Sequence, residues 1–252
     1  HHKTLHYQDQ HTISGDLLTK NGRPLASENG RSKTEWRPLG VVNCIQITYF
    51  SESTLFNEKE NIEAIIRAAL AADGAIDVLI VDDSSPDGTN DIVKRLITEF
   101  NGRLHLEIRT TKDGLGRAYV HGFKWALANN YEYIFEMDAD FSHDPNDLPR
   151  LYAACHDDGN DLAVGSRYVM GVNVVNWPIG RVLMSFFASQ YVRIVTGFNV
   201  HDTTAGFVCY RRRVLETIPL EKIRFKGYAF QIEMKFTAYK IGFKIKEVPV
   251  IF

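Results

Sequence analysis

The sequence has few cysteines, and their spacing argues against two common roles. Cys44, Cys155 and Cys209 are far apart, odd in number and without a C-x-x-C pair. This pattern argues against a disulfide framework and against a zinc site, and it makes a reducing compartment the default expectation. A formal net charge of −2 over 252 residues also argues against a general polyanion binder, so no nucleic-acid partner is expected.

Long apolar runs are also missing. No run approaches the ~20 residues needed to cross a bilayer, so the chain as given is expected not to span a membrane, although it can lie on one. The first 40 residues are polar and lack the basic-then-apolar order of a signal peptide. We interpret residues 1–40 as a leader, tag or foreign segment, and residues 41–252 as the folded domain, which stops directly after its last strand.

From residue 58 onwards, two kinds of apolar pattern alternate. Residues 58–72, "EKENIEAIIRAALAA", carry apolar side chains at helical spacing, whereas the continuous apolar run after residue 75, "IDVLIVDD", is typical of a strand buried on both faces. The alternation continues with helices expected over 91–100, 114–129 and 146–158, and strands over 104–110, 131–140 and 161–169. Strands that alternate with crossover helices predict an α/β fold with a mostly parallel sheet flanked by helices.

The second half of the sequence is organised differently. Residues 176–198, "NWPIGRVLMSFFASQYVRIVTGF", place apolar side chains along one helical stripe flanked by Arg181 and Arg193. Taken alone, such a stripe is more often part of a core than a membrane contact. A strand followed by a helix, a further helix and a final strand are expected over 203–252.

Acidic residues follow two of the expected strands. Asp138 and Asp140 end the run "YIFEMDAD", and Asp82 and Asp83 end the run "IDVLIVDD". Ligands of open parallel sheets bind beyond the carboxyl ends of the strands, so we expect these acids to line one crevice.

Each acidic pair has a functional and a structural interpretation. Two carboxylates flanking one small residue suit a divalent cation, because Mg²⁺ commonly takes one or two carboxylates together with substrate phosphates. The alternative for Asp138 and Asp140 is a solvated turn or a helix N-cap. Asp82 and Asp83 can accept hydrogen bonds from a base or a ribose, as in dinucleotide folds, or they can cap the following helix.

Arginine and histidine side chains are further candidates for the site. Arg167 follows a buried strand through "GSR", and its guanidinium suits a phosphate at the rim of the crevice. His121, His143 and His201 show no metal-ligand spacing and are interpreted as non-functional by default.

The ordered motifs resemble a known family. These are "FNEKENI", "VDDSSPDGT", "GLGRAYVHGFKWA", "MDADFSHDP", "VGSRYV", "GYAFQIEM" and "EVPVIF". Together, over residues 56–252, they resemble the GT-A-fold (Rossmann-like) family-2 glycosyltransferases, and closely the dolichol-phosphate or polyprenol-phosphate mannose synthases. Two departures stand out: Thr54 and Phe56 replace the family's Pro and Tyr, and the chain ends at Phe252, where the family continues into a basic loop and sometimes into membrane helices.

The resemblance implies an inverting transfer of mannose from GDP-mannose to dolichyl or polyprenyl phosphate, with Mg²⁺ or Mn²⁺ as cofactor. It implies a peripheral enzyme on the cytoplasmic face of a membrane (the ER in a eukaryote, the inner membrane in a prokaryote), with residues 179–198 as an amphipathic interface helix. A membrane-anchoring subunit or a transmembrane segment outside this sequence is an open alternative. Because the acceptor is already an anionic phosphate, the chemistry needs alignment and a stabilised leaving diphosphate rather than a strong general base.

The resemblance also assigns site residues, with Asp140, Arg167 and Arg181 as the catalytic ones. The nucleoside is assigned to Glu58, Asp82 and Asp83; the metal and the diphosphate to Asp138, Ala139 and Asp140, with Ser142 on the metal side; and the lipid phosphate to Arg167, Arg181 and Ser185. Three alternatives stay open: a polyprenyl-phosphate glucosyltransferase, a polysaccharide-type family-2 glycosyltransferase, and an inactive module that only binds a nucleotide sugar.

Overall fold

The computed structural model describes residues 43–49, 58–85, 88–100, 102–110, 114–175, 177–225 and 227–252. All of these lie in one compact unit, Trp36–Phe252. The predicted leader over residues 1–40 falls outside the described residues, and the predicted domain boundary stays a prediction.

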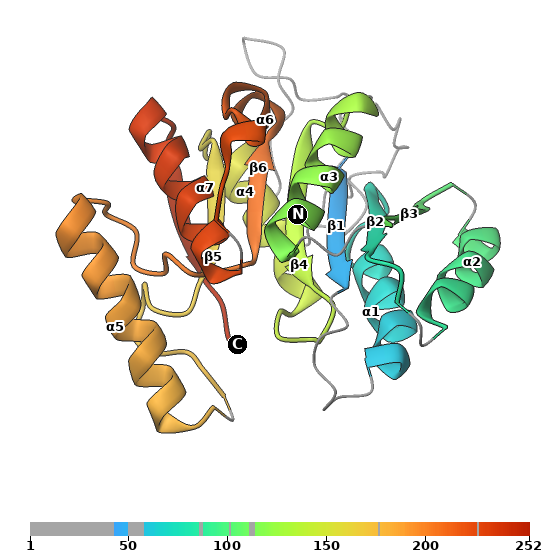
Figure 1. Ribbon diagram of the computed structural model, residues 1–252, viewed down its shortest axis with the longest axis horizontal. Helices are drawn as coiled ribbons and strands as arrows, with labels where there is room; N and C mark the ends of the chain where they lie inside the picture. Colours follow the sequence, from blue (N-terminus) through green and yellow to red (C-terminus); the bar gives the residue numbers. More distant parts are fainter. Residues whose placement is uncertain are drawn as a thin grey trace, which may run out of the picture. The chain divides into compact units, whose positions relative to one another are not determined.

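Within the described residues, the strands form one seven-stranded sheet in the order β3-β2-β1-β4-β6-β5-β7 (Figure 1). The strands are β1 (Asn43–Tyr49), β2 (Ile76–Asp82), β3 (Leu104–Ile108), β4 (Tyr133–Asp138), β5 (Leu162–Ser166), β6 (Val208–Arg211) and β7 (Ile245–Pro249). The helices are α1 (Glu58–Ala72), α2 (Thr89–Phe100), α3 (Leu115–Ala128), α4 (Leu148–His156), α5 (Ile179–Thr196), α6 (Arg212–Thr217) and α7 (Tyr228–Ile241), with 3-10 turns η1 (Pro145–Asp147) and η2 (Leu220–Lys222).

The sheet is mostly parallel, which confirms the predicted fold class. Strands β3, β2, β1 and β4 run parallel, and so do β5 and β7. Strand β6 is antiparallel to both of its neighbours, β4 and β5. It therefore separates a four-stranded half, which carries the acidic strand ends, from β5 and β7, on whose side α5 lies (Figure 1).

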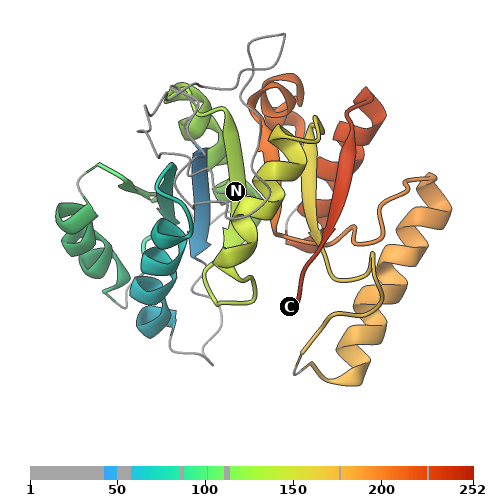
Figure 2. The ribbon, with the colours of Figure 1, turned by 180° about the vertical axis from the view of Figure 1, so that it is seen from behind.

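Helices cover both faces of the sheet. One buried apolar cluster joins the sheet to α1, α2 and α4, and a second joins it to α3, α6 and α7 (Figures 1 and 2). The close packing of α3 against α7 explains why residue 116, in the "GLGRA" segment, is a glycine. A Cβ on Gly116 would lie 2.8 Å from Cδ2 of Phe230, so only glycine lets the two helices approach this closely. Each fully buried aliphatic side chain contributes about 1.5–3 kcal/mol relative to its exposed state.

The two groups of acids lie at the carboxyl ends of β2 and β4, on the same side of the sheet along the strand direction. Strand β1 pairs Tyr49 with Asp82 on one side and Thr48 with Asp138 on the other. Asp82 and Asp138 are therefore two inter-strand spacings apart, or about 10 Å between backbones. Because side chains alternate along a strand, Asp82 points to the face covered by α2 and Asp138 to the face covered by α3.

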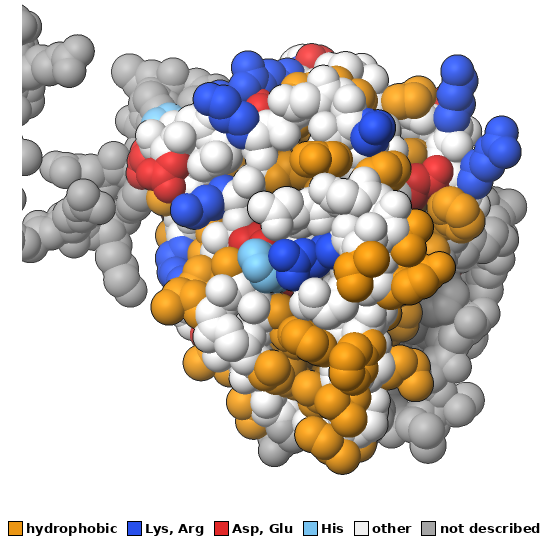
Figure 3. Space-filling view, turned by 90° about the vertical axis from the view of Figure 1, so that its left-hand side faces the viewer, with side chains coloured by type: hydrophobic (Ala, Val, Ile, Leu, Met, Phe, Trp, Pro, Cys, Tyr) orange, Lys and Arg blue, Asp and Glu red, His pale blue; other side chains and the backbone are white. Residues whose placement is uncertain are grey.

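Helix α5 packs differently from the others. It begins at Ile179, as the apolar stripe predicted, but Ser189 is its one buried residue. Figure 1 shows α5 beyond α7 at the β7 side of the sheet, and Figure 3 shows hydrophobic side chains gathered on that face. Among the described helices, none is long and apolar enough to cross a membrane.

Candidate functional site

Asp138 ends strand β4 with its side chain 40% exposed. Its Oδ1 accepts a hydrogen bond of 2.8 Å from the hydroxyl of Tyr119 on α3, and its Oδ2 lies 3.8 Å from Nε2 of His143. Burial alone would raise the pKa of this carboxyl, but interactions with His143, Tyr119 and Arg167 outweigh burial and lower it. Asp138 is therefore held as an anion whose side chain stays partly exposed.

The loop after β4 exposes a second carboxylate. Asp140 is exposed, and its Oδ1 accepts a hydrogen bond of 2.9 Å from the backbone N–H of Ser142. Between them, Phe141 has a φ of 58°, a conformation that bulky residues rarely adopt. Ala139 packs its side chain into the core, so only its backbone is available to a ligand.

The donor set at this loop fits a hard divalent cation. Asp138 and Asp140 supply exposed carboxylate oxygens, and Ser142 adds a half-buried hydroxyl. Within the part of the chain that the structure describes, no group of three or more His, Cys, Asp or Glu side chains could hold a metal. A cation here would therefore complete its shell with oxygens from substrate phosphates or water, which is the usual habit of Mg²⁺.

Asp82, at the end of β2, is completely buried, and its two carboxylate oxygens fit different roles: one caps the following helix and the other is left for a ligand. Its Oδ2 accepts hydrogen bonds from the backbone N–H of Ser85 (3.0 Å) and from Nδ2 of Asn90 on α2 (2.8 Å), as a capping residue would. Its Oδ1 has no hydrogen-bond partner among the described residues, which leaves one acceptor for a ligand.

Asp83 is more strongly tied to the protein. Its Oδ1 accepts a hydrogen bond of 2.8 Å from Arg109, and both side chains are buried, so the charge of Asp83 is compensated internally. Glu58 begins helix α1, but its side chain lies outside the described part of the chain.

Arg167, Arg181 and Ser185 line one pocket of about 280 Å³, which lies between α5, the loops after β5 and before β6, and the start of α7. The remaining lining residues are Trp177, Met184, Ala188, Thr204 and Tyr228. The guanidinium of Arg181 lies 3.9 Å from the centroid of the Trp177 ring, a cation–π contact. Among the described residues Arg181 forms no ion pair, so its charge is available to an anion in the pocket.

Arg167 is held rigidly at the wall of this pocket. Its Nε and Nη2 each donate a hydrogen bond of 2.6 Å to the fully buried Asp202, and Nη2 also donates to Oγ1 of Thr204 at 2.9 Å. Burial alone would lower the pKa of Arg167, but the pairing with Asp202 raises it. Arg167 therefore stays charged in one fixed orientation, whereas Arg181 is exposed.

The metal-side loop and the pocket share two sets of contacts. The ring of Phe252 lies 4.9 Å from that of His143 and 5.1 Å from that of Trp177, between centroids. In the loop before β6, Thr204 hydrogen-bonds Arg167, and a Cβ on Gly206 would lie 3.5 Å from Oδ2 of Asp138. The two groups of predicted site residues are therefore neighbours in the fold.

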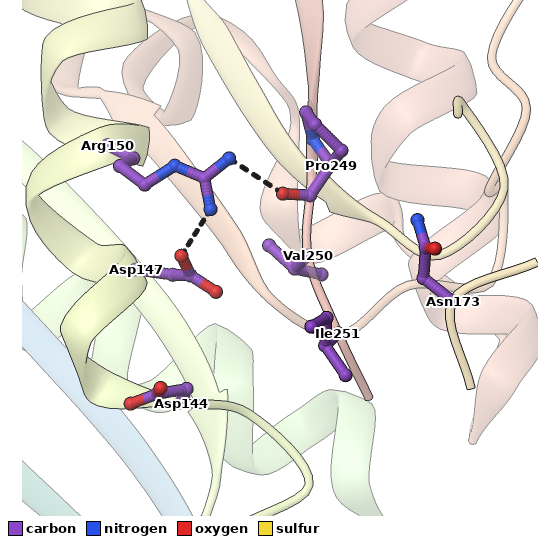
Figure 4. A pocket seen from close by; sticks show the side chains of 7 residues that line it. All are labelled: Asp144, Asp147, Arg150, Asn173, Pro249, Val250 and Ile251. Atoms are coloured by element: carbon purple, nitrogen blue, oxygen red, sulfur yellow. Dashed lines mark hydrogen bonds and ion pairs between the residues drawn. The ribbon is translucent and has the colours of Figure 1, made fainter. Parts of the chain in front are cut away.

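A second pocket, of about 330 Å³, lies beside the end of β7 and contains no predicted site residue (Figure 4). It is lined by Asp144, Asp147, Arg150, Asn173, Pro249, Val250 and Ile251. Its one cation, Arg150, is already bound to Asp147 and to the carbonyl of Pro249. The pocket therefore presents no uncommitted positive charge.

Several residues at the site did not stand out in the sequence. His143, interpreted there as non-functional, is buried with its Nε2 3.8 Å from Oδ2 of Asp138, and neither ring nitrogen has a hydrogen-bond partner among the described residues. Its position three residues after Asp140, within the same motif, was the available signal. Trp177 lies just before α5 and close to Arg181 in the sequence, but Thr204 and Tyr228 reach the pocket only through the tertiary fold.

Comparisons with known proteins identify the family of the chain. Residues 54–219 match the family model "Glycosyl transferase family 2". The chain is 46% identical over 197 residues to a polyprenol monophosphomannose synthase of Mycolicibacterium smegmatis, covering 78% of this chain and 74% of the relative. It is 45% identical over 197 residues to an undecaprenyl-phosphate mannosyltransferase of Micrococcus luteus, covering 78% and 80%.

A more distant likeness supports the fold. Glucosyl-3-phosphoglycerate synthase from Mycobacterium tuberculosis, solved with Mn²⁺, UDP and glucosyl-3-phosphoglycerate, superposes with a TM-score of 0.59 at 17% identity, covering 83% of this chain and 70% of that chain. From the family match and the two close relatives, we conclude that the chain belongs to glycosyl transferase family 2 and is a glycosyltransferase with the predicted GT-A fold.

Proposed function

We propose that this glycosyltransferase moves mannose from GDP-mannose to a polyprenyl or dolichyl phosphate, with inversion at the anomeric carbon. The two relatives with about 45% identity are named for mannosyl transfer to polyprenyl phosphates. The observation that carries the proposal is the adjacency of Asp138 and Arg167: Thr204 hydrogen-bonds Arg167, and Gly206 in the same loop lies next to the carboxylate of Asp138. One subsite suits a cation-bound diphosphate and the other an anionic phosphate.

On the donor side, the nucleoside is assigned to the end of β2, where the Oδ1 of Asp82 has no partner among the described residues. Glu58 and Asp83 are assigned to the same subsite. Asp138, Asp140 and Ser142, with the backbone of Ala139, would hold Mg²⁺ or Mn²⁺ against the diphosphate. A bound divalent cation supplies charge neutralisation on the leaving GDP.

On the acceptor side, Arg167 and Arg181 would bind the lipid phosphate, and Ser185 would donate a further hydrogen bond. A fixed guanidinium orients the phosphate, because that of Arg167 cannot turn away without breaking two hydrogen bonds to Asp202 and one to Thr204. The phosphate oxygen is already an anion, so these residues have to align it behind the anomeric carbon rather than deprotonate it.

The exposed apolar side of α5 supports a membrane-bound setting for this reaction. Side chains such as Ile179, Met184 and Phe187 are 61–75% exposed on the helix that also forms the phosphate pocket. An amphipathic helix lying in the bilayer interface would place the pocket where a lipid phosphate is found. We infer a peripheral location at the cytoplasmic face of a membrane.

A donor-panel assay tests the proposal. The purified chain, a short-chain polyprenyl phosphate and Mn²⁺ or Mg²⁺ are incubated with labelled GDP-mannose or UDP-glucose, and butanol-extractable label is counted. We expect transfer from GDP-mannose, none from UDP-glucose, and loss of transfer with EDTA. Preferred transfer from UDP-glucose would contradict the donor assignment, and EDTA-resistant transfer would contradict the metal.

Asp140→Asn provides the site-specific arm of this assay. Loss of a carboxylate ligand should lower turnover by at least about 100-fold while the melting temperature changes little. Asp158→Asn is the matched control, because Asp158 is exposed after α4, at the opposite edge of the sheet. Equal rates in the two variants would refute the role of Asp140.

A further inference from the structure

A buried glutamate on β7 organises the loop that reaches Arg167. The side chain of Glu247 is 8% exposed and accepts four hydrogen bonds. Its Oε1 accepts from Oγ of Ser166 (2.7 Å) and from the backbone N–H of Asp202 (2.9 Å). Its Oε2 accepts from the backbone N–H of His201 (2.8 Å), and it lies 2.7 Å from Nδ1 of the same residue. One carboxylate thus fixes two consecutive backbone groups.

Asp202, which Glu247 fixes through its backbone, in turn fixes Arg167. Its side chain accepts hydrogen bonds from the backbone N–H of Arg167 (2.9 Å) and from the guanidinium at Nε and Nη2. Ser166, the residue before Arg167, is held by the same Glu247. Both ends of the Arg167–Asp202 pair therefore depend on Glu247.

The rest of this loop is anchored independently. Nζ of the buried Lys235 donates to the carbonyl of Ala205 (2.6 Å), and Oγ1 of Thr203 is 3.2 Å from Oγ of Ser189 on α5. These contacts hold the part of the loop nearer Asp138 and α5. Glu247 alone, among these anchors, acts on the end that carries Asp202.

We propose that Glu247 is a positioning residue that aims Arg167 at the acceptor phosphate through Asp202. The proposal rests on the proposed function, which places that phosphate in the pocket lined by Arg167, Arg181 and Ser185. Glu247 does not line this pocket, so it acts only through the residues that it holds.

The pattern of donors shows why a carboxylate is needed at this position. Both oxygens of Glu247 face a backbone N–H, one from Asp202 and the other from His201. In a glutamine, one of the two groups would be an NH₂, which cannot accept. Either orientation of the amide would therefore set a donor against a backbone N–H and push part of the loop away. Glu247→Gln is nearly isosteric, yet it should misalign Arg167.

Steady-state kinetics test this role. We expect Glu247→Gln to raise KM for a short-chain polyprenyl phosphate about 10- to 100-fold, because small misplacements of a positioning group cost this much. KM for GDP-mannose should stay within about twofold, because the diphosphate side does not depend on Glu247. Glu247→Asp, which keeps the charge but is shorter, should restore part of the loss.

The matched control is Glu216→Gln, which removes a half-exposed carboxylate paired with Arg212 on α6. It should leave both KM values unchanged. If Glu247→Gln changes both KM values equally, or changes neither, the positioning role is wrong and Glu247 is only part of the framework.

A second readout does not depend on the acceptor. The Nε–H resonance of Arg167, assigned by its loss in Arg167→Lys, reports the hydrogen bond to Asp202. We expect it to shift or broaden in Glu247→Gln and to stay in place in Glu216→Gln; an unchanged resonance would overturn the proposal. If the wild-type chain transfers no mannose to polyprenyl phosphate, the proposed function fails, while this readout still decides whether Glu247 orients Arg167.

Discussion

Helices α1 and α5 both carry a stripe of apolar side chains, but the stripe of α1 is buried and that of α5 is exposed. Helix α1 buries Ile62, Ile65 and Ile66 completely against the sheet. On α5, Ile179 and Ile194 are 74% and 82% exposed. Periodicity therefore predicts a helix and its apolar side, whereas the neighbours that the fold supplies decide whether that side becomes core or surface.

This difference indicates that some helices of the domain stabilise the core, whereas α5 forms a surface for binding. Exposed apolar patches of this kind mark interaction sites rather than stable monomer surface. The helices of the four-stranded half stabilise the sheet whose ends carry Asp82 and Asp138. Helix α5 contributes little to the core but forms the pocket with Arg181 and Ser185.

The largest expected effect is on stability and should be confined to α1. Ile65→Ala removes a fully buried side chain and should lower the free energy of unfolding by about 2–5 kcal/mol. Leu183→Ala on α5 is the matched change at an exposed position and should stay within about 0.5 kcal/mol of wild type. Urea denaturation measures both. Equal losses would show that α5 belongs to the core.

A second prediction concerns α7, which buries a charge-bearing residue. Burial lowers the pKa of Lys235 to about 8, opposed by the nearby carboxyls of Glu136, Asp202 and Glu247 and reinforced by Arg167. Between pH 8 and the unfolded value of 10.5, the unfolded chain binds a proton that the native state does not. Stability should therefore rise with pH across this window, by at most about 3 kcal/mol.

Lys235→Met should remove this rise. Thermal unfolding from pH 7 to 10.5 makes the comparison, with Lys124→Met, at a half-exposed lysine paired with Glu221, as the control that keeps it. An identical slope in wild type and Lys235→Met would mean that Lys235 titrates normally.

The smallest expected effect is on membrane binding. Phe187→Asp places a charge on the exposed stripe of α5 and should weaken flotation with vesicles containing anionic lipid by about 10-fold, without changing the melting temperature. Ile108→Asp, at a 45% exposed position on β3, serves as the control and should float like wild type. Unfolding of Phe187→Asp, or normal flotation, would contradict the interfacial role of α5.

The sequence predicted the parallel sheet and the acidic strand ends because both depend on local patterns. The continuous apolar runs before Asp82 and Asp138 are buried strands, as expected, and the structure shows that both pair with β1. The antiparallel direction of β6 was not predicted, because four residues, Val208–Arg211, carry no signal of strand direction. Pairing with β4 and β5 alone decides it.

The site residues stay predictions, but their placement can be compared with the fold. Arg167, Arg181 and Ser185, which the family resemblance assigned to one phosphate, line one pocket. Glu247 lies in the motif "EVPVIF", but nothing in the sequence indicates that it contacts Asp202, 45 residues earlier, because their hydrogen bond exists only once β5 and β7 are paired. His143 has no metal-ligand spacing in the sequence, so its position next to Asp138 was not predicted.

The most direct test of the account compares two Michaelis constants in one variant. Arg181→Gln removes the exposed guanidinium of the α5 pocket and leaves the end of β4 untouched. We expect KM for polyprenyl phosphate to rise about 10- to 100-fold, the usual effect of losing a charged hydrogen bond, and KM for GDP-mannose to stay within about twofold. A raised KM for GDP-mannose with an unchanged KM for the lipid would contradict the assignment of the pocket to the acceptor.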